Sequence, residues 1–121
     1  MSSFAEQVNA AVAAHGQWKV RLRQAIATGN SEFDVAVVSQ DSQCAFGKWL
    51  YGDGKFSFPS PAVREEIRQL HAEFHKEAAR VLGLAVTGKG KEASLAMEPG
   101  SAFAKISGTL VNHLVHVQKA A

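Results

Sequence analysis

Two histidines, His71 and His75, lie four positions apart in a stretch whose apolar periodicity is typical of an α-helix. Residues at this spacing stand one turn above each other on the same helix face, so one helix can offer both imidazoles to a single metal ion. The chain also contains one cysteine, Cys44, and a further histidine, His15. Three imidazoles and one thiolate form a complete tetrahedral donor set for Zn²⁺. These four residues are therefore predicted to bind zinc.

Each of the four residue types also has an ordinary explanation. A histidine in an apolar seam is usually a hydrogen-bonded core residue, a lone cysteine often packs as a small hydrophobic side chain, and a chain with five histidines readily contains two of them four apart. The conjunction favours a metal site, because the four residues fall on three predicted helices, on or beside their inward faces. Burying three imidazoles without partners would be costly, and one shared ion would satisfy them all.

The first predicted helix begins at a capping box formed by Ser3 and Glu6 and ends at Thr28-Gly29-Asn30, where glycine allows a left-handed exit. Its apolar residues recur at spacings of three and four, which indicates one buried seam. His15 lies in the middle of this seam, among Phe4, Val8, Ala11, Trp18, Leu22 and Ala25.

Three further helical regions are predicted. A short helix over roughly residues 43–51 carries Cys44, a long helix starts at Ser60-Pro61 and runs to about residue 86, and a last region begins near Lys91, is interrupted at Pro99-Gly100 and resumes at Ser101. Residues 30–42 are expected to form a packed connection, in which the apolar run at residues 35–38 is either extended or one helical turn. The pattern predicts a single all-α domain over residues 1–121, an antiparallel four-helix bundle with one short helix carrying the cysteine.

Composition excludes several classes of function. The net charge of +2 is small and the basic residues are scattered, which argues against nucleic-acid binding. No apolar run approaches membrane-spanning length, and the first seven residues lack the features of a signal peptide. A single cysteine cannot form an internal disulfide. We expect a cytoplasmic protein in which the thiol stays reduced.

Three blocks of sequence carry a resemblance to a known family. They are His15-Gly16-Gln17-Trp18, then Cys44-Ala45-Phe46-Gly47-Lys48-Trp49-Leu50-Tyr51, then Leu70-His71-Ala72-Glu73-Phe74-His75. In this order they resemble the chemoreceptor zinc-binding (CZB) domain, and the chain is similar to a stand-alone bacterial member. The resemblance implies a bundle of four or more helices that binds zinc through His15, Cys44, His71 and His75. It also implies a homodimer that senses zinc or hypochlorous acid, and a partner in a chemoreceptor or diguanylate cyclase pathway.

Cys44 is the redox-reactive element in this interpretation, because the thiolate is the only soft, oxidisable ligand of the four. A metal and a helix N-terminus both lower the pKa of a thiol, and accessible thiolates of low pKa are oxidised first. Gly47, on the same helix face as Cys44, is expected to let another helix approach closely.

Five further side chains are singled out, two of them with an alternative role. Asp41 is expected to cap the short helix, with a hydrogen bond to a ligand imidazole as the alternative. Trp18 and Trp49 are expected to pack in the core, with shielding of the metal as the alternative for Trp18. His113 and His116 lie outside the three blocks, and we expect both at the surface.

Three other functions compete with sensing. A zinc hydrolase would need an open coordination position and a nearby carboxylate base, but Glu73 lies about 200° around the helix from each histidine, so no enzymatic activity is expected. A hemerythrin-like di-iron bundle would need bridging carboxylates, and Gln118 stands where that family has aspartate. A purely structural zinc would use the same four ligands as a sensor.

Overall fold

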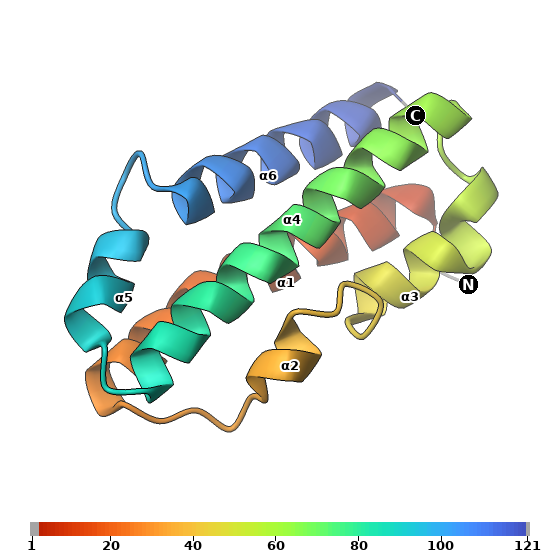
Figure 1. Ribbon diagram of the computed structural model, residues 1–121. Helices are drawn as coiled ribbons and strands as arrows, with labels where there is room; N and C mark the ends of the chain where they lie inside the picture. Colours follow the sequence, from red (N-terminus) through yellow and green to blue (C-terminus); the bar gives the residue numbers. More distant parts are fainter. Residues whose placement is uncertain (1–2, 121) are drawn as a thin grey trace.

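The computed structural model describes residues 3–120, and Figure 1 shows three long helices that run alongside one another. These are α1 (Phe4–Thr28), α4 (Pro61–Val86) and α6 (Ala102–Ala120). Helices α1 and α4 run in the same direction, and α6 runs in the opposite direction. The chain returns from the end of α1 to the start of α4 through α2 (Val35–Val38), α3 (Ala45–Tyr51) and the 3₁₀ turn η1 (Asp53–Phe56). The all-α bundle is thus confirmed, and the segment between α1 and α4 consists of short helices.

The ends of the long helices follow the predicted capping residues. The Ser3 side chain accepts from the Glu6 N–H at 3.1 Å, and the Glu6 carboxylate accepts from the Ser3 N–H at 3.1 Å. Gly29 leaves α1 with a φ of 75°, a left-handed conformation that side chains with a Cβ rarely adopt. Ser60 caps α4 and Pro61 occupies its first turn. These local signals fix where α1 and α4 begin and where α1 ends.

The hydrophobic core lies between α1, α4 and α6. Each helix contributes one apolar stripe, as the periodicity predicted. The most deeply buried large side chains are Leu22 of α1, Phe74 and Leu82 of α4, and Phe103, Leu110 and Leu114 of α6. Helix α5 (Gly90–Ala96) buries Ala93 and connects α4 to α6 at one end of the bundle. The buried stripes of the three long helices therefore form most of the core.

The structure adds two details to the predicted connection. Residues 35–38, for which the sequence left an extended stretch or one helical turn open, form a helical turn, α2, because the Asp34 carboxylate accepts from the backbone N–H groups of Ala36 and Val37. Helix α3 begins at Ala45, and Cys44 caps it with its own sulfur. The prediction that Asp41 caps this helix was wrong, because Asp41 lies too far before the first helical residue.

Among residues 3–120, no helix combines the length and the apolar character needed to cross a bilayer. The predicted domain span also includes Met1, Ser2 and Ala121, which lie outside the described residues.

Candidate metal centre

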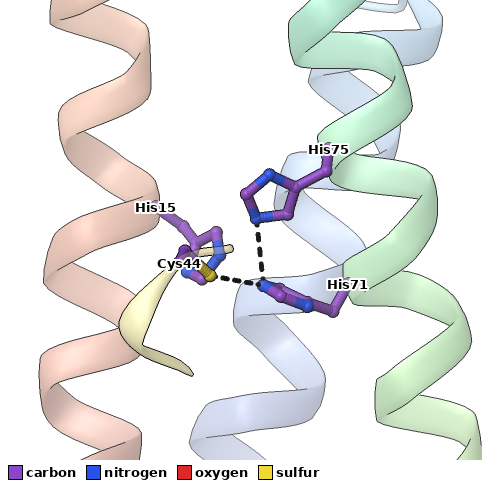
Figure 2. Close-up of side chains that lie close together, drawn as sticks. All are labelled: His15, Cys44, His71 and His75. Carbon is purple, nitrogen blue, oxygen red and sulfur yellow. Dashed lines mark hydrogen bonds between the residues drawn. The ribbon is translucent and has the colours of Figure 1, made fainter. Parts of the chain in front are cut away.

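Four side chains from three parts of the chain meet inside the bundle (Figure 2). His15 comes from α1, Cys44 from the start of α3, and His71 and His75 from successive turns of α4. Each offers one donor atom, and these four atoms all lie within 4.8 Å of one another. The structure thus brings together all four residues that the sequence singled out.

Backbone carbonyl groups determine which ring nitrogen faces the centre of the cluster. His15 Nδ1 lies 2.6 Å from the Ala11 carbonyl oxygen, and His75 Nδ1 lies 2.9 Å from the Val38 carbonyl oxygen. A carbonyl oxygen only accepts, so in both rings Nδ1 carries the proton. The Nε2 lone pairs of His15 and His75 are therefore left free for the shared space.

The donors are close enough to share one positive partner. His71 Nε2 lies 3.1 Å from His75 Nε2 and 3.3 Å from Cys44 Sγ. A proton on His71 Nε2 would satisfy one neighbour at a time, whereas a cation in the middle satisfies all four donors. The donor set of three imidazoles and one thiolate also matches a structural zinc site. The residues present therefore fit a zinc ion.

Burial disfavours the charged form of all three histidines. Their exposed fractions are 3%, 0% and 2% for His15, His71 and His75. Burial lowers the pKa of His15 to about 4 and that of His71 to about 2, and it also lowers the pKa of His75. The hydrogen bonds from His15 to Ala11 and from His75 to Val38 oppose burial without cancelling it. Neutral imidazole is the form that binds a metal.

Cys44 is held by the first turn of α3. Its sulfur accepts from the Gly47 N–H at 3.3 Å, and the side chain is partly buried. Burial raises the pKa of the thiol, and the N–H groups of Gly47 and Phe46 oppose this effect without overcoming it. The helix N-terminus therefore acts on the thiol pKa in the expected direction, and burial outweighs it. A bound cation would favour the thiolate.

Gly47 is needed for the close packing of the segment that carries Cys44. A Cβ at this position would lie 1.7 Å from the Asp41 carbonyl oxygen and 2.8 Å from its carbonyl carbon. The group that approaches Gly47 is thus the backbone of Asp41, and not another helix as the sequence suggested. The loop before α3 thus packs tightly against the first turn of that helix, and only glycine fits at position 47.

Replacing Gly47 by alanine should open this loop and displace Cys44. We expect a loss of about 1–3 kcal/mol in the free energy of unfolding, the usual cost of forcing an extra carbon into packed structure, together with a lower zinc content. Urea denaturation and metal analysis would measure both. Gly16→Ala is the matched control, because a Cβ there meets nothing within 4 Å, and it should stabilise α1 by about 0.5–1 kcal/mol. Equal stability and zinc content in both variants would show that the loop tolerates opening.

Aromatic rings surround the histidines. The ring centroid of Phe46 lies 5.1 Å from that of His71, and the ring centroid of Phe74 lies 4.9 Å from that of His15, both edge-on. Trp49 contacts Phe46, and Trp18 packs against Phe33. Phe46 and Phe74 are the closer neighbours of the cluster, a role that the sequence pattern did not assign to them.

A small hollow between α1 and α3 reaches the cluster from outside. It has a volume of about 240 Å³, and its wall includes Ala10, Ala14, Trp18, His15 and Cys44. The small side chains of α1 leave this space open beside the sulfur. Both Cys44 and His15 line this hollow, and Cys44 is the more exposed of the two.

Asp41 lies beside the cluster, although it does not cap α3. Its carboxylate accepts from the Tyr51 hydroxyl at 2.6 Å, and its Oδ2 lies 4.0 Å from His71 Nδ1. Sequence reasoning did not assign a role to Tyr51. Tyr51 follows Asp41 by ten residues, and no helical or strand periodicity predicts a contact at that spacing.

The remaining candidates lie away from the cluster. Glu73 is exposed, as its helical phase predicted. His116 is exposed, and His113 is partly exposed and pairs with Glu66 through its Nε2 at 2.5 Å. Within residues 3–120, no aspartate or glutamate belongs to the four-residue cluster.

The chain was compared with known proteins. The family model described as the chemoreceptor zinc-binding domain matches residues 15–82, which is more than half of the chain and includes all four cluster residues. Neither a curated protein nor a solved structure matches the chain.

Proposed function

Because the chain belongs to the chemoreceptor zinc-binding domain family, we propose that it is a regulatory domain that binds one zinc ion through His15, Cys44, His71 and His75. The observation that carries this proposal is the convergence of the four donor atoms within 4.8 Å. The carbonyl groups of Ala11 and Val38 support it, because they aim two imidazole lone pairs at the shared space.

The donor set favours zinc over other metals and regulation over catalysis. A thiolate with imidazoles suits zinc better than magnesium, calcium or a di-iron pair, and a hemerythrin-like centre would need carboxylates in the cluster. Four protein ligands leave no open coordination position, whereas catalytic zinc sites keep one. The exposed position of Glu73 leaves the site without the base that a hydrolase would need. We therefore propose a binding role and no enzymatic one.

We further propose that oxidation of Cys44 is the signal. Bound zinc would hold the sulfur as a thiolate. With hypochlorous acid, the sulfur loses two electrons and gains oxygen, chlorine leaves as chloride, and the product is a sulfenic acid. The hollow beside Cys44 lets a small oxidant reach the sulfur, while the three imidazoles are buried and survive mild oxidant. Oxidation thus converts the only anionic donor into a weaker one.

The short helix α3 is the element that would respond. Its side chains Phe46 and Leu50 are buried, and the Arg64 guanidinium donates to the Leu50 carbonyl oxygen at 3.1 Å. These contacts hold α3 at its C-terminal end, while Cys44 holds its beginning. Loss of the bond at Cys44 would release the first turn of α3 and the loop before it.

Hydrogen exchange tests this proposal. An equimolar amount of hypochlorous acid should release zinc and lower protection across α2 and α3, while α1, α4 and α6 keep theirs. Cys44→His is the control, because it can retain a nitrogen donor while removing the oxidisable sulfur. If mass spectrometry shows Cys44 oxidised while zinc and protection stay unchanged, the zinc is a structural support and the sensing proposal fails.

Family membership also supports a proposal about partners. We propose that the chain forms a homodimer and acts on a signalling protein of the chemoreceptor or diguanylate cyclase type, in the cytoplasm. Light scattering of the zinc-loaded protein tests the first part, since a mass corresponding to one chain at micromolar concentration would contradict it.

A further inference from the structure

His71 is approached on both ring nitrogens by one short segment of the chain, residues 41–51. On one side, Nε2 lies 3.3 Å from Cys44 Sγ and faces the centre of the cluster. On the other side, Nδ1 lies 4.0 Å from Asp41 Oδ2. The ring is fully buried, and Nδ1 has no hydrogen-bond partner. An orphaned nitrogen in a buried ring calls for an explanation.

The other two histidines show what is missing. His15 donates its Nδ1–H to the Ala11 carbonyl oxygen, and His75 donates its Nδ1–H to the Val38 carbonyl oxygen. Metal-binding histidines almost always donate their second N–H in this way, which fixes the ring and the tautomer. For His71, the corresponding place is taken by the carboxylate of Asp41.

Tyr51 holds that carboxylate in place. Its hydroxyl donates to Asp41 Oδ2, the same oxygen that faces His71, at 2.6 Å. Tyr51 is the last residue of α3, and Asp41 lies at the start of the tight loop closed against Gly47. The two residues therefore connect both ends of the segment that carries Cys44.

We propose that Asp41 and Tyr51 are positioning residues, a relay in which Tyr51 orients Asp41 and Asp41 holds the proton of His71 on Nδ1, so that Nε2 faces the metal. The inference rests on the proposed zinc site. The separation of 4.0 Å is longer than a direct hydrogen bond, and it should shorten when zinc is bound, because Nδ1 then carries a proton beside a carboxylate. The packing of α3 against the bundle therefore helps to set the tautomer of His71 on α4.

Zinc affinity of Asp41 variants, measured by chelator competition, is the first test. Asp41→Ala should weaken binding by about 10–100-fold, the usual effect of removing such a partner. Asp41→Asn should weaken it less, because the amide oxygen still accepts, and Tyr51→Phe should also lose less than Asp41→Ala. Asp53→Ala is the matched control: it removes an exposed acidic residue of the neighbouring turn η1 and should leave the affinity unchanged.

A second measurement distinguishes a role of Asp41 in orienting His71 from a role in stabilising the fold alone. In the zinc-loaded protein, the Nδ1 proton of His71 should give a downfield, slowly exchanging NMR signal. This signal should move upfield and exchange faster in Asp41→Asn, and should persist in Asp53→Ala. If Asp41→Ala does not fold, Asp41→Asn carries the test.

The outcomes for the relay and for the zinc site are distinct. Parental affinity in the Asp41 variants, or an unchanged His71 proton signal, would overturn the relay while leaving the zinc site standing. Failure of the parent protein itself to bind zinc would overturn both.

Discussion

Substituting any one of the four cluster residues should strip the protein of its zinc. Cys44→Ser removes the only anionic donor, and alanine at position 15, 71 or 75 removes one imidazole and opens a gap in a closed tetrahedral set. We expect less than about a tenth of the parental zinc to survive gel filtration, as metal binding depends steeply on a full ligand set.

Two matched substitutions separate ligand loss from general damage. Glu73→Ala changes the residue between the two α4 histidines, on the exposed face of the same helix. His113→Ala removes a histidine of α6 that pairs with Glu66 outside the cluster. Both variants should retain one zinc per chain. Loss of zinc in Glu73→Ala would mean that the orientation of α4 is wrong. Full retention of zinc in the four ligand variants would contradict a zinc site made of these residues.

Chelating the zinc should lower the stability of the protein without unfolding it. A ligand that binds only the folded state contributes about 4 kcal/mol when its free concentration is a thousandfold above the dissociation constant, so a loss of this order is expected. The apolar stripes of α1, α4 and α6 do not depend on the metal, and their core side chains, such as Leu22, Leu82 and Leu110, are fully buried. The bundle should therefore stay helical, unlike a zinc finger.

Far-UV circular dichroism during urea titration measures this effect, with and without chelator. The metal-free protein should show near-parental helicity in buffer and an earlier unfolding midpoint. His71→Ala should have the same midpoint with and without chelator, because it has no zinc to lose. A random-coil spectrum on chelation would contradict the account of the core, and identical midpoints in the parent would contradict metal binding.

The long helices and the ligand set could be predicted because their signals are local and periodic. The capping box at Ser3, the glycine exit at Gly29 and the Ser60-Pro61 start all act within a few residues of their own position. The spacing of His71 and His75 places both on one helix face, and the seam of α1 places His15 on its buried side. The helical spacing of residues therefore predicted both the core and most of the metal site.

The arrangement around Cys44 could not be predicted in the same way. The cap of α3 is the sulfur itself, a weak acceptor that sequence rules do not favour at that position. The hydrogen bond from His75 to Val38 and the pairing of Tyr51 with Asp41 join residues far apart in the chain or separated by a tight loop. Burial, which raises the pKa of the Cys44 thiol, is likewise a property of the assembled bundle. Such contacts depend on tertiary packing, which the periodicity of apolar residues does not predict.

The visible and near-ultraviolet spectrum of the cobalt(II)-substituted protein shows whether the four residues bind one tetrahedral metal ion through a thiolate. Cobalt(II) follows zinc into tetrahedral sites, and its spectrum reports both the geometry and the presence of a thiolate. We expect intense visible bands from a tetrahedral ion and a near-ultraviolet sulfur-to-cobalt charge-transfer band, which disappears in Cys44→Ser and persists in Glu73→Ala. Weak bands typical of six-coordinate cobalt, or a charge-transfer band that survives Cys44→Ser, would contradict a zinc site made of His15, Cys44, His71 and His75.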